Sequence, residues 1–305
     1  MHALIGILAV FSAVLGGFLL ESGNLFVLLQ PAELLIVGGA AAGIIMVANP
    51  PPVIRHMVRG ACSAFRPPAR TPPVFLQHIR MLYEVFCFVQ RAGAMELERD
   101  VEDPARSRIF ANHPGFLRDA RTRDFVCDSL RMLVLGVTSA PELDQLMELD
   151  IDVQRRARQE PVSALHSIAD ALPGLGIVAA VLGVVITMQA IGGAPETVGQ
   201  KVAAALVGTF LGILLCYGVV GPIAARMEKM SETETQFLQV LRIAIVAFAR
   251  GSSPILAVEY ARRSIPVELR PSFIDMETSI RRDARIPPVT KGEAAEAVGG
   301  TVQPA

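Results

Sequence analysis

The chain has 305 residues, of which 52% are hydrophobic, more than the roughly 45–50% apolar content usual for soluble domains. Its 28 basic and 29 acidic residues leave a net charge of -1, which argues against a nucleic-acid partner. The four cysteines contain no C-x-x-C pair, and the histidines lack helical metal-ligand spacing. Neither a disulfide framework nor a metal site is therefore predicted.

Four long stretches contain no charged residue. They lie before Glu21, between Glu33 and Arg55, between Asp170 and Glu196, and between Lys201 and Arg226. At about 1.5 Å per helical residue, each is long enough to cross about 30 Å of hydrocarbon. Strand patterns are nearly absent, so the sequence predicts an all-α integral membrane protein with four transmembrane helices and a helical cytoplasmic domain.

The distribution of basic residues predicts the orientation in the membrane. The loop Glu21–Glu33 has no Lys or Arg, and the loop Gly192–Lys201 has only its last residue, while the other basic residues fall in 50–170 and 223–305. Basic flanks are retained in the cytoplasm, so both termini are expected there, in a bacterial inner membrane. Because Met1-His2 supplies no basic region typical of a signal peptide, we expect the first span to be retained.

These signals divide the chain into five predicted segments. Outside the membrane, apolar residues recur with helical spacing near 75–93, 125–134, 143–151 and 227–251. Proline clusters at 50–52 and 67–73 predict a helix stop and a linker. The segments are transmembrane helices 1 and 2 with a short periplasmic loop (1–49), a cytoplasmic helical domain (50–170), transmembrane helices 3 and 4 (171–225), a cytoplasmic helical tail (226–285) and a disordered end (286–305).

Five short motifs occur in a fixed order. The fourth apolar stretch contains Ala205–Ile213 and reaches Pro222, and the other four motifs are Gln30–Glu33, Leu97–Asp100, Leu172–Gly176 and Arg270–Phe273. Together they closely resemble the MotA family of flagellar motor stator subunits over nearly the whole chain. The resemblance implies a motility and chemotaxis component, not an enzyme, that couples ion flow to torque on a rotor.

Small residues form two candidate helix-packing faces. Ala205, Thr209 and Gly212 recur at helical spacing around Gly208 in the fourth stretch, and Gly39 and Gly43 form a G-x-x-x-G pair in the second. Such faces allow helices to approach closely. Each pattern alone is equally compatible with ordinary helix packing, but together they suggest an oligomer.

Two prolines lie near the cytoplasmic ends of the third and fourth spans. By sequence alone, Pro173 is best explained as the first turn of its helix, a position that proline favours. The MotA resemblance instead implies that Pro173 and Pro222 couple ion binding to movement.

The transported ion follows from the resemblance and from ligand chemistry. Sodium-driven relatives typically have a threonine where this chain has Ala180, whereas the threonine matching Thr209 occurs in both types. A sodium ion needs several oxygen ligands, and alanine offers none from its side chain. We expect proton drive, with sodium as the alternative, and no cofactor.

A proton carrier is not evident in the spans. Glu33 and Asp170 lie at their ends, where solvated acids are ordinary, so neither is expected to be the carrier. The resemblance implies that the partner MotB supplies an aspartate against the third and fourth spans, and that five copies of this chain surround two MotB chains.

Charged cytoplasmic residues are candidates for rotor contact. The resemblance implies that Glu98 contacts the rotor protein FliG, and Asp150 is a weaker acidic candidate. At the family's basic position this chain has Gln90, with Arg91 one place later, so the register of the contact differs from the family pattern. A solvated charged surface is the simpler explanation for each residue.

Two other functions compete with this one. An ExbB- or TolQ-like energiser of outer-membrane processes also surrounds a partner helix, but such proteins typically have three spans. A membrane scaffold would need the small-residue faces but not the combination of Pro173, Thr209 and Pro222.

Overall fold

The computed structural model describes residues 2–136, 138–189, 192 and 194–282, and every regular element in this part of the chain is helical. The predicted disordered end, 286–305, lies outside the described residues. The chain divides into two compact units. Unit 1 comprises Met1–Thr71 and Ser139–Arg242, and unit 2 comprises Pro72–Thr138 and Ile243–Ala305.

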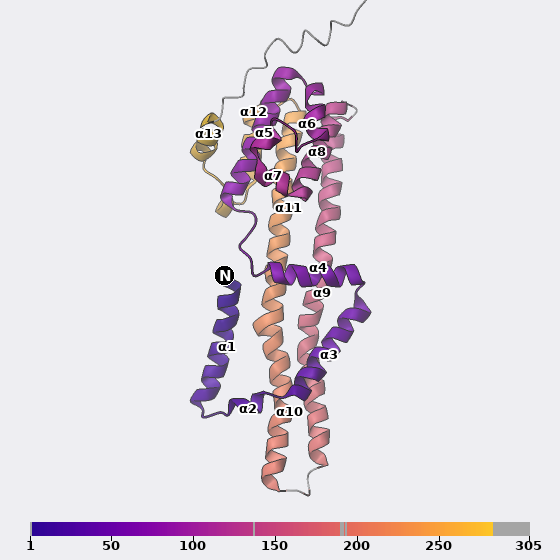
Figure 1. Cartoon of the computed structure of the whole chain (residues 1–305), viewed down its shortest axis with the longest axis vertical. Helices are drawn as coiled ribbons and strands as arrows, with labels where there is room; N and C mark the ends of the chain where they lie inside the picture. Colours follow the sequence, from indigo (N-terminus) through magenta and orange to yellow (C-terminus); the bar gives the residue numbers. More distant parts are fainter. Residues whose placement is uncertain (1, 137, 190–191, 193, 283–305) are drawn as a thin grey trace, which may run out of the picture. The chain divides into compact units, whose positions relative to one another are not determined.

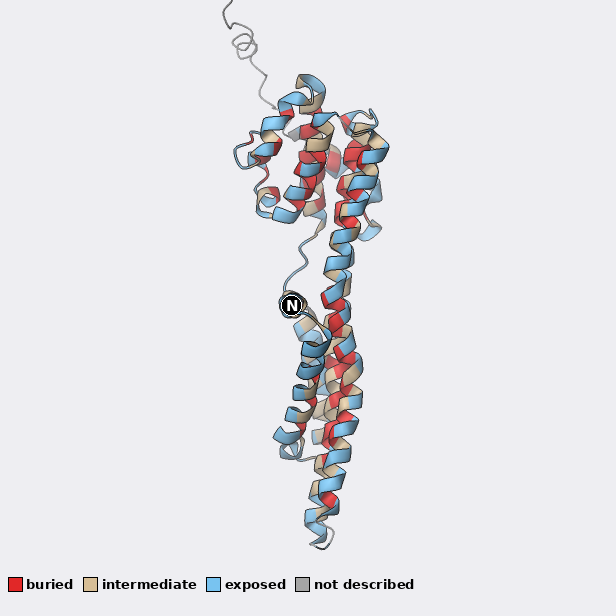
Figure 2. Ribbon diagram, turned by 90° about the vertical axis from the view of Figure 1, so that its right-hand side faces the viewer, coloured by how far each residue is buried: buried red, intermediate tan, exposed pale blue. Residues whose placement is uncertain are grey.

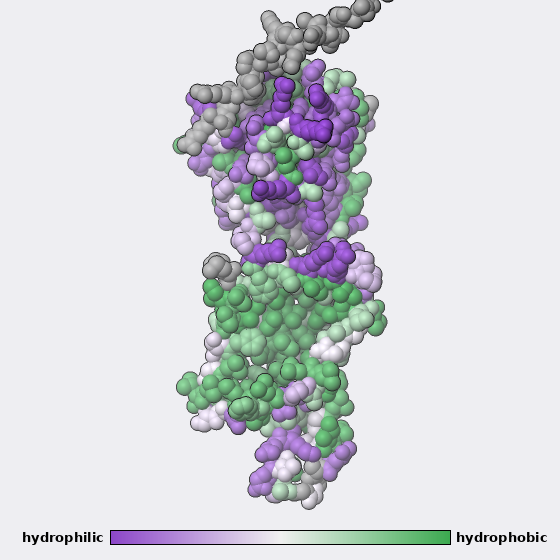
Figure 3. Space-filling model, viewed as in Figure 1, coloured by the Kyte–Doolittle hydropathy of each residue, from purple (hydrophilic) through white to green (hydrophobic). Residues whose placement is uncertain are grey.

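Unit 1 contains the membrane helices (Figure 1): α1 (His2–Leu20), the short α2 (Leu25–Leu28), α3 (Pro31–Ala48), α9 (Ala140–Met188) and α10 (Pro195–Leu215). A π-helical turn, Cys216–Val220, joins α10 to α11 (Gly221–Ala249). Four helical segments are long and apolar enough to cross a membrane: Ala3–Leu20, Leu25–Ala48, Ala140–Met188 and Pro195–Ala249. The four predicted spans are therefore confirmed, and Figure 3 shows hydrophobic residues gathered over α1, α3 and the adjoining parts of α9 and α10.

Helix α9 is a single helix of 49 residues. Its start is fixed by a capping box, in which the Ser139 side chain accepts from the Glu142 backbone N–H and the Glu142 carboxylate accepts from Ser139. At about 1.5 Å per residue it is roughly 74 Å long, more than twice the thickness of the hydrocarbon core. The helix predicted at 143–151 and the third span are therefore parts of one element. The helix predicted at 227–251 likewise continues the fourth span, through α11.

The prolines at 50–52 do more than stop α3. Pro51 and Pro52 occupy the first turn of α4 (Pro51–Ser63), where a missing backbone N–H costs nothing. This helix lies across α9 in Figure 1, with Met57 buried in the core of unit 1. The predicted helix stop is present, and a new helix follows it at once, because prolines that end one helix can begin the next.

Unit 2 is built around α5 (Pro72–Ala92), and Figure 2 shows its buried residues in red. Phe75, Ile79, Leu82 and Phe86 of α5 are at most 1% exposed. The unit also contains α6 (Glu98–Glu102), α7 (Pro114–Arg118), α8 (Ala120–Leu135), α12 (Pro254–Ser264), α13 (Phe273–Arg282) and the 3-10 turns Met95–Leu97, Phe110–Asn112 and Val267–Leu269. The helices predicted near 75–93 and 125–134 correspond to α5 and α8.

The tail motif Arg270–Phe273 has a structural role in unit 2. The Arg270 side chain donates hydrogen bonds to the carbonyl oxygens of Ile265 (2.9 Å) and Arg263 (2.8 Å). Arg262 of α12 donates to the Pro271 carbonyl at 3.1 Å and forms an ion pair with Glu259 at 2.7 Å. These contacts fix the turn between α12 and α13.

Replacing Glu259 by glutamine is expected to destabilise unit 2 more at neutral pH than in acid. Hydrogen bonds from Arg262, and then from Arg263, outweigh the effect of burial and lower the pKa of Glu259 to about 2. Because this pKa is depressed on folding, the stabilisation is complete above about pH 4.5 and disappears as the pH falls toward 2. Unfolding of the detergent-solubilised wild type and Glu259→Gln should differ by about 1–3 kcal/mol at pH 7, and less at pH 3. A difference that does not change between these pH values would contradict this assignment.

Candidate functional site

Helices α9 and α10 touch through their backbones at glycines. A Cβ atom on Gly176 would lie 2.7 Å from the Gly208 carbonyl oxygen and 3.2 Å from the Gly212 Cα atom. A Cβ atom on Gly212 would lie 2.5 Å from the Leu172 carbonyl oxygen. No side chain fits at these positions, so the glycines set the closest approach of the two helices.

The predicted small-residue face of the fourth span therefore packs against α9 of the same chain. Ala205 is 1% exposed, and its Cβ atom lies 2.6 Å from the place that a Cβ atom on Gly183 would occupy. Gly208 and Gly212 are also buried. The sequence pattern predicted close packing here but could not identify the helix that provides it.

The two residues linked to ion choice lie at this contact. The Thr209 hydroxyl donates to the Gly176 carbonyl oxygen at 3.5 Å, the long limit of a hydrogen bond. Ala180 belongs to the opposite helix, and its backbone nitrogen lies 3.2 Å from the place of a Cβ atom on Gly208. The Thr209 hydroxyl is thus weakly held and half-buried, so it can accept another partner.

Both predicted coupling prolines lie inside long helices. Pro173 lies 33 residues after the first residue of α9, so the simpler explanation, that it starts the helix, was wrong. A proline at this position removes the hydrogen bond to the Ala169 carbonyl oxygen and crowds it.

Pro222 lies two residues after the end of the π-helical turn in the fourth span. In that turn the Gly221 N–H reaches back five residues to the Cys216 carbonyl oxygen. The wider turn accommodates the missing N–H of Pro222, and π-turns of this kind often lie at functional sites. Each long membrane helix thus has a local break in its hydrogen-bond pattern.

Gly39 and Gly43 lie on a different face of α3 from the one that packs in unit 1. Both are exposed, and a Cβ atom on either would meet no atom within 4 Å among the described residues. The buried positions of α3 are Glu33, Val37 and Ala41, spaced four residues apart. The G-x-x-x-G face is therefore free for a neighbour in the membrane.

Glu33 is not the solvated end-of-span acid that the sequence predicted. Its residue is 7% exposed, and its Oε2 atom is buried with no hydrogen-bond partner among the described residues. The burial arises because α3 packs against both α9 and α10, which no local pattern reveals. The four-residue spacing of Glu33, Val37 and Ala41 was the signal that could have indicated a shared buried face. Asp170, in contrast, is exposed as predicted.

The candidate rotor-contact residues fall in both units. Arg91, in the last turn of α5, and Glu98, at the start of α6, are exposed on unit 2, as is Gln90. Asp150 belongs to α9 in unit 1, is half-buried, and accepts a hydrogen bond from Gln154 at 3.2 Å. These positions are equally consistent with an ordinary charged surface and with a contact to a rotor protein.

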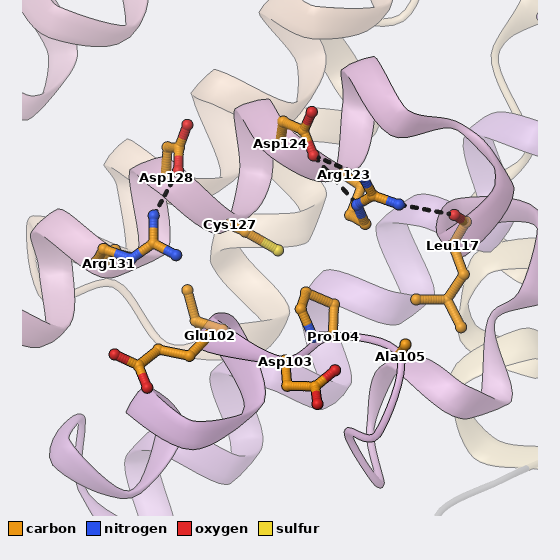
Figure 4. Close-up of a pocket in the computed structure, with 11 residues that line it drawn as sticks. Glu102, Asp103, Pro104, Ala105, Leu117, Arg123, Asp124, Cys127, Asp128 and Arg131 are labelled. Atoms are coloured by element: carbon orange, nitrogen blue, oxygen red, sulfur yellow. Dashed lines mark hydrogen bonds and ion pairs between the residues drawn. The ribbon is translucent and has the colours of Figure 1, made fainter.

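Unit 2 also has a polar hollow of about 440 Å³ beside α6 and α8 (Figure 4). Ion pairs at its rim join Arg131 to Asp128 at 2.6 Å and Arg123 to Asp124 at 3.0 Å. Burial raises the pKa of the Cys127 thiol in this hollow to about 12, so the thiol stays protonated and is a poor nucleophile and metal ligand. In the part of the chain that the structure describes, no three acidic, His or Cys residues could together hold a metal ion.

Known proteins with similar sequences and folds agree with this architecture. The motility protein A N-terminal family matches residues 4–93, and the MotA/TolQ/ExbB proton channel family matches residues 118–240. Motility protein A of Salmonella typhimurium is 36% identical over 92% of this chain and 95% of its own length, and that of Escherichia coli is 35% identical over the same shares. Chemotaxis protein LafT of Vibrio parahaemolyticus is 34% identical over 91% of this chain and 97% of its own length.

Solved structures show the same fold. The structure of C. jejuni MotAB has a TM-score of 0.74 at 18% identity, covering 89% of this chain and 98% of that one. The flagellar MotAB stator complex from Bacillus subtilis has a TM-score of 0.71 at 22% identity, covering 87% and 96%. With its four membrane helices, its glycine-packed helix pair and relatives that match it almost end to end, the chain belongs to the motility protein A family of membrane-embedded, non-enzymatic proton channel proteins.

Proposed function

We propose that this chain is the stator subunit that couples proton flow to torque in a bacterial flagellar motor. The observation that carries the proposal is the glycine-packed pair of α9 and α10. Thr209 lies at the contact between the two helices. A proline also interrupts the backbone hydrogen bonds of each long helix, Pro173 in the third span and Pro222 in the fourth. Such a pair can bend at two defined points without losing its packing. It therefore suits a device that converts an ion-binding event into a movement.

A partner subunit completes the ion path in this proposal. Solved relatives are described as MotAB complexes, and we infer that a MotB-type chain contributes an aspartate against α9 and α10. One proton that moves down about 150 mV releases roughly 3.5 kcal/mol. That energy is enough to shift a two-state conformational equilibrium by more than a hundredfold.

We expect the ion to be a proton. The matched family is a proton channel family, and Ala180 provides no side-chain oxygen at the position where sodium-driven relatives have one. Thr209 alone cannot replace the several oxygen ligands of a sodium ion. Tethered cells that depend on this chain should rotate in sodium-free medium and stop with an uncoupler. Rotation that withstands the uncoupler but stops when sodium is removed would overturn proton drive.

The assembly and its position complete the proposal. We infer five copies around two MotB-type chains in the bacterial inner membrane, with both termini in the cytoplasm. The exposed Gly39 and Gly43 face of α3 supports an oligomer, because it has room for another helix. The broader MotA/TolQ/ExbB family match does not distinguish a stator subunit from an ExbB- or TolQ-like energiser. The motility protein A match at residues 4–93 favours the stator subunit.

Reversing the charge of Glu98 is expected to reduce torque without affecting assembly. Glu98 is exposed at the start of α6, so Glu98→Lys leaves the core unchanged, while it repels a basic patch on a FliG-type rotor protein. We expect motor torque under load to fall several-fold at low ionic strength. Glu102→Lys, an exposed acid in the same helix, is the matched control. Unchanged torque in Glu98→Lys would assign Glu98 to the ordinary solvated surface.

A further inference from the structure

Glu33 combines burial with the absence of a partner. It lies in the first turn of α3, is 7% exposed, and its Oε2 atom has no hydrogen-bond partner among the described residues. An ionised carboxylate in such a place is strongly disfavoured, and acids buried in membrane segments commonly mark ion pathways. A packing role alone would be better served by an apolar side chain.

The surroundings of the carboxyl group are shaped to admit it. Its Oε2 atom lies 2.6 Å from the place of a Cβ atom on Gly208, and its Oε1 atom lies 3.5 Å from that on Gly183. Ala179 and Ala205 complete the contact between α9 and α10 at this level. These facing groups are neither charged nor titratable. Lys201, the one cation in α10, is half-exposed and forms no ion pair with Glu33.

The carboxyl group also lies beside the proposed ion path. It touches Gly208, the residue directly before Thr209, and the Ala180 nitrogen lies near the same Cβ position of Gly208. Glu33 is near the amino-terminal end of α3, which the proposed topology places toward the outside. The group is thus positioned between the outer solution and the weakly held Thr209 hydroxyl.

We propose that Glu33 is a second proton-carrying group of the complex, supplied by this chain, that passes protons from the outer solution to the partner's acid. In the first step a hydronium ion protonates a Glu33 oxygen and leaves water. In the second step that O–H bond breaks as the partner's carboxylate, directly or through water, takes the proton, and Glu33 becomes a carboxylate again. No electrons are exchanged. This inference rests on the proposed stator function.

The test compares rotation in cells that depend on this chain. Glu33→Gln keeps the size and polarity of the side chain but cannot carry a proton, so we expect motor speed to fall by about tenfold or more while the complex assembles normally. Glu33→Asp should rotate with an altered dependence of speed on external pH. The matched control is Glu196→Gln, an exposed acid that also follows a proline in the first turn of a membrane helix. It should behave as wild type.

Infrared spectroscopy of the purified complex provides a readout that does not depend on rotation. Wild type and Glu196→Gln should both show a component of the pH-responsive carboxylic acid band that Glu33→Gln lacks, while the component from the partner's acid remains in all three. Retention of the complete band, or wild-type speed in Glu33→Gln, would overturn the proposal. If Glu33→Gln does not assemble, an unchanged pH dependence in Glu33→Asp would overturn it as well. A wild-type chain that supports no rotation would instead disprove the stator function, and the infrared comparison would still test proton binding at Glu33.

Discussion

Gly176→Ala is expected to abolish rotation and to destabilise the assembled complex. The added methyl group would lie 2.7 Å from the Gly208 carbonyl oxygen and 3.1 Å from the Thr209 Cα atom, and both are backbone atoms that cannot rotate away. The helices α9 and α10 must therefore separate at the level of Thr209. Overpacking of this kind costs about 1–3 kcal/mol. The measurements are tethered-cell rotation and thermal unfolding of the purified complex.

Gly174→Ala is the matched control for this prediction. Gly174 lies half a turn away in the same helix, and a Cβ atom there would meet nothing within 4 Å among the described residues. Alanine in a helix interior is favoured over glycine by about 0.5–1 kcal/mol, so this variant should be slightly more stable and should rotate. The two substitutions are thus expected to change stability in opposite directions. Normal rotation in Gly176→Ala would show that the close backbone contact is not required.

Pro173→Ala is expected to stop rotation for the opposite reason, since it should strengthen α9. Alanine restores the backbone N–H that can bond to the Ala169 carbonyl oxygen, and it removes a residue that costs about 3 kcal/mol in a helix interior. The variant should be at least as stable as wild type but unable to bend at this point. Protein level and thermal unfolding should be unimpaired while torque is lost.

Pro161→Ala is the control for Pro173→Ala. Pro161 is the other proline inside α9 and lies 12 residues earlier in the helix, outside the stretch without charged residues. Its replacement should likewise strengthen the helix, but with rotation retained. Equal loss of rotation in both variants would indicate a general need for flexibility in α9, and rotation by Pro173→Ala would count against a coupling role.

The membrane architecture could be predicted because hydropathy acts over whole helices. Each uncharged stretch was long enough to define a span whatever its neighbours were. A helix end could also be predicted where the backbone conformation favours glycine. Gly93, which follows α5, has a φ of +95°. These features depend on local sequence, so they needed no knowledge of the tertiary contacts.

Proline was harder to interpret, because its effect depends on its position within a helix. Pro51 begins α4, whereas Pro161 and Pro173 are accommodated within α9. The change in hydropathy near Asp170 predicts a change in the surroundings of α9, but the helix continues through it without interruption. The five predicted segments therefore remain a prediction of which residues lie in the membrane and which lie in water. They do not predict where helices begin and end.

The buried state of Glu33 could not be predicted, because its neighbours come from distant parts of the chain. Gly183 and Gly208 form the space around its carboxyl group, and they lie more than a hundred residues away in the sequence. The sequence places Glu33 at the end of a span, where water is usually available. Packing of α3 against α9 and α10 instead buries most of the residue.

The most direct test of the account is rotation of tethered cells that lack this gene, with sodium absent and the proton-motive force intact. We expect the deletion to stop rotation and the wild-type chain to restore it, whereas Pro173→Ala should not restore it although it reaches the membrane at the wild-type level. Rotation that continues in the deletion strain, or that is restored by the wild-type chain only when sodium is added, would contradict a proton-driven stator.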